Sequence, residues 1–351
     1  MNLGPISISD KSAFQALSKK EYQFYQNWFN ENLTPILVME IFSDLSKFEE
    51  ENHEKAVELA KKFGGSGNPT NADYIPLIAG SLLGKKIPMN GKIIINQGIE
   101  IEDKETNSKG LLVDITALNL LLLNIASNKI TEDDKEYSKK WREITLGFNL
   151  ETIYAKLDQQ KFILPKPKNE TEIVSIASNL LSNPRTQKDW LLFFLDIFFI
   201  TKSIKDRIYS RWRASKHNYK LANFAPYAYH CFRSYLSVVI ATKYGIIKNN
   251  PTNFLDLNYI YYLPFCQVFI SNDRLHKLLI PQLKRKNQFF VTGEELKKDI
   301  KRILNEINVE RDANHPLSIK IKNREFPNVN AESIIEKIRK NCLIPDAFSE
   351  N

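Results

Sequence analysis

Two short apolar segments near opposite ends of the chain each lead to an aspartate. The segment Ile6–Ser9 alternates and stops at Asp10, and the segment Val268–Ser271 is followed closely by Asp273. β-branched and aromatic residues favour strands, and ligands gather at the carboxyl ends of parallel strands in α/β folds. If the two strands are neighbours, both aspartates face one crevice, and the two ends of the chain must fold together.

Helix signals accompany both strands. The segment Ser18–Glu21 is a capping box, in which a serine and a glutamate satisfy the free amides at a helix start. Thr34-Pro35 suits either an N-cap followed by the first helical position or the edge of a strand. The segment Thr292–Glu295 is a second capping box. Between these parts the patterns are mainly helical, with one or two helices expected over 133–161. The sequence thus predicts α/β structure near both ends and a helical middle.

Composition narrows the class of protein. The chain is 43% hydrophobic and 26% charged, a composition that excludes wholesale disorder. Its length of 351 residues exceeds what one small domain needs. The three cysteines lie far apart, so neither a disulfide framework nor a structural zinc site is expected. Both of the most apolar runs, 111–125 and 190–200, contain an aspartate and are too short to span a membrane. We therefore expect a cytoplasmic protein without a membrane partner.

Further acids lie in apolar surroundings on predicted helices. Glu40 and Asp44 are four residues apart and share one helical face. Asp256 is flanked by apolar residues and lies 17 positions before Asp273. Converging carboxylates repel one another, and burial without a partner raises their pKa. A hard divalent cation, Mg²⁺ or Mn²⁺, offsets both effects, and such a site can activate water beside a phosphodiester.

Each of these acids also has an ordinary structural interpretation. Asp10 can cap the helix that follows it, since aspartate is a favoured N-cap. Glu40 and Asp44 can form a solvated helix face. Asp256 can pair with a lysine or arginine, and Asp273 can be a turn residue. The metal-site hypothesis requires these side chains to meet at one point.

The same residues give the chain a resemblance to the PIN-domain nucleases. Segment 8–12 resembles that family's first-strand motif, an aspartate followed closely by a hydroxyl residue. Segment 34–45 resembles its second motif, with a glutamate on the next helix, and in segment 256–273 a helical aspartate precedes a strand that ends near a fourth acid. The resemblance implies catalytic, metal-binding acids at Asp10, Glu40, Asp256 and Asp273, support from Ser12 and Asp44, and Mg²⁺ or Mn²⁺ as cofactor.

The resemblance covers residues 6–60 and 250–305, under half of the chain. It implies an α/β fold in which a PIN-like core, a small parallel sheet flanked by helices, carries a large, mostly helical insertion. Gln267 stands where the family has an extra acid, and Asn258 is a second uncharged residue near the acids. Asp114, after another apolar run, is the rival for the first acid. The expected boundaries are 1–62 and 249–307 for the core, 63–248 for the insertion and 308–351 for an appendage.

Basic residues gather in two places in this chain, whose formal charge is +8. The stretch 202–220 holds seven cations and one acid among aromatic residues, and a second cluster, expected to guide a strand into the acidic site, follows Asp273. Cations pair with phosphates, and aromatic faces stack on unpaired bases. The alternative for the first stretch is an amphipathic helix with Trp212 in the core and its cations solvated. The nucleic-acid-binding candidates are Arg207, Arg211, Arg213, Lys284, Arg285 and Lys286.

Three other motifs favour no competing chemistry. The segment Gly64–Pro69 lacks the Gly-Lys-Ser/Thr of a phosphate-binding loop. His230 and Cys231 lack an orienting acid, so a Cys–His nucleophile is disfavoured. His276, three residues after Asp273, can contact a phosphate, shuttle a proton or lie on the surface, and the sequence favours the surface.

These patterns together predict a divalent-metal-dependent nuclease that cleaves RNA or single-stranded nucleic acid in preference to duplex DNA. The resemblance also suggests a toxin-like or antiviral, phage-defence effector. Its insertion would set substrate choice or bind a regulatory protein partner or a second copy of the chain. The alternative is a non-catalytic PIN-like module that binds nucleic acid or protein without cutting.

Overall fold

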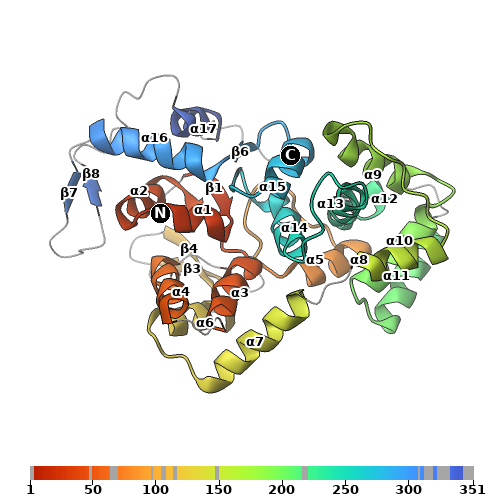
Figure 1. Ribbon diagram of the computed structural model, residues 1–351, viewed down its shortest axis with the longest axis horizontal. Helices are drawn as coiled ribbons and strands as arrows, with labels where there is room; N and C mark the ends of the chain where they lie inside the picture. Colours follow the sequence, from red (N-terminus) through yellow and green to blue (C-terminus); the bar gives the residue numbers. More distant parts are fainter. Residues whose placement is uncertain are drawn as a thin grey trace.

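A parallel sheet joins the two ends of the chain (Figure 1). The computed structural model describes residues 4–46, 50–63, 70–95, 98–103, 108–113, 117–146, 150–215, 220–306, 309–311, 319–321 and 333–342. The four strands, in the order β2-β1-β5-β6, are β1 (Ile6–Ser9), β2 (Asn30–Glu31), β5 (Val268–Ile270) and β6 (Phe289–Val291). All three pairings are parallel. The predicted α/β class, with a small parallel sheet flanked by helices, is confirmed.

Strands β1 and β5 are direct neighbours, which is the condition for their aspartates to face one crevice. Ser7 pairs with Val268 and Ser9 with Ile270. The amide of Asp10 continues the ladder by donating to the Ile270 carbonyl oxygen at 3.1 Å. Because the strands are parallel, residues that follow β1 and β5 lie at the carboxyl edge of the sheet. Residues that precede β5 and β6 lie at the opposite, amino edge.

The N-terminal helices begin at the predicted caps. The Ser18 hydroxyl accepts from the Glu21 amide at 3.3 Å, and the Glu21 carboxylate accepts from the Ser18 amide at 2.7 Å. The Thr34 hydroxyl accepts from the Leu37 amide at 3.3 Å and so caps the helix that carries Glu40. The helices of this part are α1 (Lys11–Ala16), α2 (Lys19–Trp28), α3 (Pro35–Asp44) and α4 (Glu50–Phe63).

The C-terminal part also follows its local signals. Thr292 and Glu295 exchange two backbone-to-side-chain hydrogen bonds, at 2.9 and 3.1 Å, in the second predicted capping box. Asp299 accepts from the Ser333 hydroxyl at 2.7 Å, which fastens the last helix to the one before it. The elements are α14 (Asn253–Tyr261), η2 (Leu263–Phe265), α15 (Arg274–Leu283), α16 (Gly293–Glu306), β7 (Val309–Arg311), β8 (Ile319–Ile321) and α17 (Ile334–Cys342).

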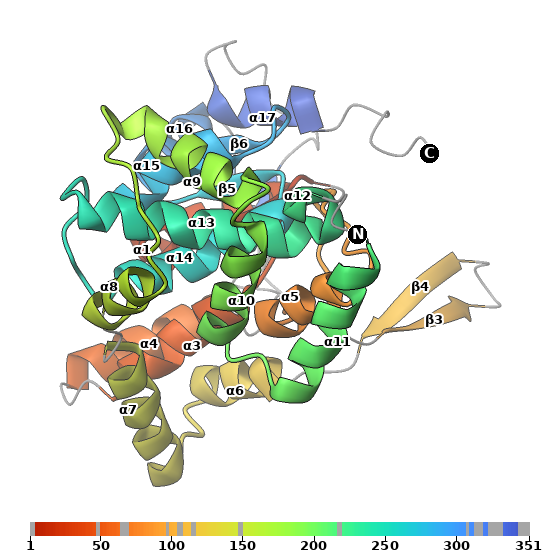
Figure 2. The same cartoon turned by 90° about the vertical axis from the view of Figure 1, so that its right-hand side faces the viewer.

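Most of the described middle part is helical, apart from one antiparallel hairpin that the sequence analysis did not predict (Figure 2). Its strands are β3 (Gly98–Asp103) and β4 (Ser108–Val113), and they are separate from the parallel sheet. The rival acid Asp114 and the glycine-rich segment 64–69 lie outside the described residues. The helices are α5 (Tyr74–Leu82), α6 (Ala117–Ala126), α7 (Glu132–Leu146), α8 (Leu150–Gln159), η1 (Glu170–Glu172), α9 (Ile173–Ser182), α10 (Gln187–Ile197), α11 (Lys202–Ala214), α12 (Leu221–Phe224) and α13 (Pro226–Lys243).

The long helix α13 is buried and packs against α5, α9 and α14. Phe232 of this helix stacks on Phe194 with ring centroids 4.3 Å apart. His230 bonds to the Ile260 carbonyl oxygen at 2.9 Å, and burial lowers its pKa to about 3, so the ring is neutral. Burial also raises the pKa of the neighbouring Cys231 thiol. Both are core residues, in agreement with the rejection of a Cys–His nucleophile.

Helix lengths and hydropathies bear on membrane insertion. Among the described residues, none of the helices combines the length and the apolar character needed to cross a bilayer.

Candidate functional site

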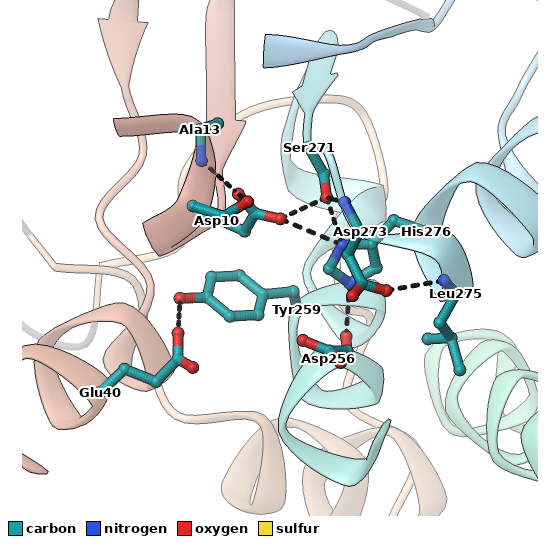
Figure 3. A network of polar contacts seen from close by, with 10 residues as sticks. Asp10, Ala13, Glu40, Asp256, Tyr259, Ser271, Asp273, Leu275 and His276 are labelled. Carbon is teal, nitrogen blue, oxygen red and sulfur yellow. Dashed lines mark hydrogen bonds and ion pairs between the residues drawn. The ribbon is translucent and has the colours of Figure 1, made fainter. Parts of the chain in front are cut away.

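Asp10 lies at the carboxyl end of β1 and caps α1. Its Oδ1 accepts from the Ala13 amide and from the Ser12 hydroxyl, both at 2.8 Å. Its Oδ2 accepts from the Ser271 hydroxyl and lies 3.5 Å from His276 Nδ1 (Figure 3). Burial alone would raise the pKa of Asp10, but the hydrogen bond and charge of His276, with Ser271 and Ala13, outweigh it and lower that pKa. Asp10 is therefore both a helix cap and a firmly ionised carboxylate.

The Ser271 hydroxyl connects the two strand ends and fixes the protonation of His276. Its oxygen accepts from the Asp273 amide at 2.9 Å and donates its single proton to Asp10. The bond of 2.7 Å between Ser271 Oγ and His276 Nδ1 must then take its proton from the ring. His276 Nε2 donates in turn to the Asp256 carbonyl oxygen at 2.7 Å. Because both ring nitrogens donate, the side chain is an imidazolium cation.

His276 is fully buried, and the sequence expectation of a surface histidine was wrong. Burial lowers the pKa of an imidazole, but here the hydrogen bond to Asp10 and the charges of Asp256, Asp10 and Asp273 raise it to about 9. The ring also packs edge-on against Tyr259, with centroids 5.9 Å apart. Below about pH 9 a positive charge therefore lies inside the group of acids.

Asp256 is on α14 and Asp273 is the N-cap of α15, where its Oδ1 accepts from the Leu275 amide at 2.6 Å. Burial raises the pKa of Asp256 to about 8; His276 lowers it, while the charges of Asp273, Glu40 and Asp10 raise it further. In the described part of the chain, no lysine or arginine forms an ion pair with Asp256. Asp256 is therefore the acid whose charge is least compensated.

Glu40 and Asp44 do not form a solvated helix face. The Glu40 carboxylate accepts from the hydroxyl of the fully buried Tyr259. Burial raises the pKa of Glu40, whereas the charge of Lys11 and the Tyr259 bond lower it. Asp44 is buried and forms an ion pair with Lys11 at 3.0 Å. Lys11 thus connects α1 with α3 through this ion pair, and it supplies a second cation beside the acids.

The four predicted acids therefore lie in one region at the carboxyl edge of the sheet, and in Figure 3 the Tyr259 ring stands between Glu40 and the other three. We name Asp10, Glu40, Asp256 and Asp273 the acid cluster. Its donors are the carboxylate oxygens that hard cations prefer, and burial together with the neighbouring carboxylates raises the pKa of Asp256. By its chemistry the donor set fits Mg²⁺ or Mn²⁺. In their present hydrogen-bonded conformations, no three His, Cys, Asp or Glu side chains of the described residues are arranged to hold a metal ion.

Some of the predicted basic side chains are exposed, and others form hydrogen bonds to backbone carbonyl oxygens. On α11, Arg207 and Arg213 are exposed and Trp212 is buried, as expected for an amphipathic helix. Arg211 instead donates to the Leu82 and Phe224 carbonyl oxygens, at 2.7 and 3.0 Å. Arg285 donates to the Met89 carbonyl oxygen. These two arginines fasten backbone segments as well as carrying charge.

The cluster Lys284–Lys286 lies at the amino edge of the sheet, because it immediately precedes β6. The acid cluster lies at the carboxyl edge, so these cations do not adjoin the acids, and the expectation that they guide a strand into the acidic site stays a prediction. Gln267 also lies at the amino edge, where its side-chain oxygen accepts from the Ile6 amide at 2.9 Å. It is therefore a cap for β1 and has no place among the acids.

Sequence reasoning missed two partners of the acids, Ser271 and Tyr259. Both lie close in sequence to a predicted acid, Ser271 two residues before Asp273 and Tyr259 three residues after Asp256. A hydroxyl near a strand-end acid is the signal that could have identified Ser271. No family model, curated protein or solved structure matches this chain.

Proposed function

We propose that this chain is a divalent-metal-dependent nuclease whose reaction centre is the acid cluster. The observation that carries the proposal is the convergence of four carboxylates from opposite ends of the sequence, with the pKa of Asp256 raised to about 8. Grouped, buried acids with perturbed pKa values are common at functional sites. The resemblance of segments 8–12, 34–45 and 256–273 to PIN-domain motifs supports the same function.

Asp10, Asp256 and Asp273 would hold Mg²⁺ or Mn²⁺, with Glu40 beside them. The bound cation would lower the pKa of a water molecule and neutralise charge on the scissile phosphate. Asp10 is suited to this role because Ser271 and His276 keep it ionised and fixed in orientation. Asp256 is largely protonated near neutral pH when no cation is present, so cation binding should release a proton from it.

Lys11 has its own part in this proposal. Its ammonium group lies 3.0 Å from Asp44 and lowers the pKa of Glu40, so it stands at the border of the acid cluster. A phosphate drawn to this border would meet one cation before it reached the acids. RNA or other single-stranded nucleic acid is the proposed substrate, and a toxin-like or phage-defence role follows from the PIN resemblance alone.

A non-catalytic PIN-like module is the second candidate, and one observation favours it. Asp10 already accepts from Ala13, Ser12 and Ser271 and lies beside His276, so its oxygens are occupied without a metal. An acid satisfied in this way can serve as a structural joint between β1, β5 and α15. A chain of this kind would bind nucleic acid or protein without cutting it.

The two candidates separate in one experiment. Labelled single-stranded RNA and DNA are incubated with Mn²⁺, Mg²⁺ or EDTA and analysed on denaturing gels, using the wild type, Asp10→Asn and Asp273→Asn. Asp158→Asn, at an exposed position on α8, is the matched control. A nuclease requires Mn²⁺-dependent cleavage that both site variants lose and the control keeps. Cleavage that persists in both site variants would refute the site, and intact substrate in all lanes would favour the binding module.

A further inference from the structure

A segment of extended chain at the amino edge of the sheet is fastened by two arginines. Residues 83–92, which we name the basic strap, follow α5 and reach the turn before β5, where the Gly91 amide donates to the Pro264 carbonyl oxygen at 2.9 Å. Arg211 donates to the Leu82 carbonyl at the start of the strap, and Arg285 donates to the Met89 carbonyl near its end. The strap therefore connects α11 with the loop 284–288.

Two glycines allow the arginines to approach this closely. Gly84 and Gly91 have φ angles of 97° and 84°, a region that residues with a side chain rarely adopt. A Cβ at Gly84 would lie 2.9 Å from Arg211 Nε, and one at Gly91 would lie 3.3 Å from an Arg285 amino nitrogen. The strap is thus shaped around the two guanidinium groups.

The cations under the strap lack acidic partners. Arg211 lies over the Phe224 ring at 4.0 Å. Burial lowers the pKa of Arg211 and Arg285, and among the described residues neither forms an ion pair with a carboxylate. Buried charge without a counter-ion projects its field to the surface above it.

The surface of the strap adds further positive charge. Lys85 and Lys86 are exposed on the strap, and Lys286 is exposed on the adjoining loop. No aspartate or glutamate occurs in 83–99 or in 284–293. The apolar residues Ile87 and Met89 are half-buried, so the strap exposes no large apolar side chain of the kind that protein interfaces bury at their centre. Positive charge without apolar anchors favours a phosphate backbone over a folded protein or a bilayer.

We propose that the basic strap, together with the loop 284–288, is a nucleic-acid-binding surface at the opposite edge of the sheet from the acid cluster. Lys85, Lys86 and Lys286 contact phosphates directly, while Arg211 and Arg285 hold the backbone in place and maintain the positive field. This surface binds whether or not the acid cluster cleaves, and it gives the chain two separate contacts for one long strand.

Binding of a fluorescent oligouridylate, measured by anisotropy in EDTA, tests this surface. The strap variant carries Lys85→Gln, Lys86→Gln and Lys286→Gln, and the matched control carries Lys166→Gln, Lys168→Gln and Lys298→Gln at other exposed lysines. Both variants lose three positive charges, so a difference in their affinity comes from where the lysines lie and not from the net charge. Titrations between about 50 and 200 mM KCl give the salt dependence, in which each phosphate contact on a single strand contributes about 0.7 to the log–log slope.

We expect the strap variant to bind at least tenfold more weakly at about 100 mM KCl and its salt slope to fall by about 2. The control should bind within about twofold of the wild type. Equal binding by the two variants would overturn the proposal, as would wild-type binding that does not respond to salt. EDTA keeps this outcome independent of the nuclease assay, because a chain that never cleaves can still show the strap effect.

Discussion

The two edges of the parallel sheet carry opposite charge and handle it in different ways. At the carboxyl edge the acid cluster is tied into hydrogen bonds and contains its own cation, His276. Near the amino edge Arg285 donates to a backbone carbonyl, and at the other end of the strap Arg211 donates to two backbone carbonyls and lies over the Phe224 ring. Among the described residues neither arginine forms an ion pair with a carboxylate. The negative charge of the acids is balanced largely by His276 and Lys11, whereas the positive charge of the arginines must be balanced by solvent ions or by a partner.

This difference has a general lesson about buried charge. A charged group that is satisfied internally can be retained for structure alone, so its presence is weak evidence of a ligand. At the carboxyl edge Asp256 and Glu40 keep raised pKa values, so these two acids fall short of full compensation, and the proposed cation site depends most on Asp256. Near the amino edge the basic side chains of the strap and the loop 284–288 lack balancing negative charge, and this favours a large polyanion over a single small ion.

The largest effect should come from His276→Phe. The change leaves Asp10 and Ser271 without their partner, and breaking a buried ion pair from one side costs about 3–5 kcal/mol of unfolding free energy. Urea unfolding of the variant and the wild type measures it. His276→Gln keeps a donor for the Asp256 carbonyl but also removes the charge, so it should lose nearly as much; wild-type stability in His276→Gln would argue against the imidazolium.

The pH dependence of the wild type sharpens the same point. Since the folded pKa of His276, about 9, lies above its ordinary 6.5, its stabilisation of about 3 kcal/mol is complete below pH 6.5 and lost as the pH rises through 9. Urea midpoints between about pH 6 and pH 10 should fall accordingly. A flat profile, or the same fall in His276→Phe, would contradict the assignment.

Asp256→Asn should act in the opposite direction. Burial raises the pKa of Asp256 to about 8, so its ionisation destabilises the folded chain increasingly as the pH rises above its ordinary 3.8 and reaches its full cost above 8. The difference between these two pKa values corresponds to about 6 kcal/mol at most, so the amide should stabilise the protein by up to that amount near pH 9 and by less than about 2 kcal/mol near pH 5. Mn²⁺ should reduce this gain, because the cation compensates the wild-type carboxylate; a gain unchanged by Mn²⁺ would count against metal binding there.

Arg285→Met should have a moderate effect at the amino edge. The variant leaves the Met89 carbonyl without its donor, which costs about 1–2 kcal/mol, and it also weakens the proposed binding to oligouridylate. Thermal unfolding and anisotropy report the two effects separately. Loss of stability with unchanged nucleic-acid binding would show that Arg285 holds the strap in place and does not contribute to binding.

The smallest stability change is expected for Lys85→Gln with Lys86→Gln. Both side chains are exposed, and exposed substitutions away from special features change the unfolding free energy by less than about 0.5 kcal/mol. A thermal midpoint equal to that of the wild type would show that weaker binding comes from lost charge. A marked drop would show that the lysines support the fold.

Local chemistry accounts for the elements that the sequence predicted. The strands at Ile6–Ser9 and Val268–Ile270, and the helix starts at Ser18, Thr34 and Thr292, all depend on alternation or on capping within a few residues. Such signals are contained in the chain itself. The hairpin β3–β4 was not predicted, since its antiparallel pairing depends on a partner segment and not on a local pattern alone.

The candidate site was predictable only in part. The order and setting of Asp10, Glu40, Asp256 and Asp273 made them candidates, but the sequence could not show that Ser271 and His276 would occupy Asp10. His276 resembled a surface residue because its burial depends on packing against Tyr259 and Phe269, which are distant or on another element.

By itself the sequence determined the strands at Ile6–Ser9 and Val268–Ile270 and the capped helix starts, and it placed an acid after each of these two strands. Only the tertiary structure decided that β1 and β5 pair, that a buried imidazolium lies among the acids, and that Lys284–Lys286 faces the other edge of the sheet. The physical reason is range: capping and alternation act over a few residues, whereas burial and electrostatic compensation are set by neighbours hundreds of positions away.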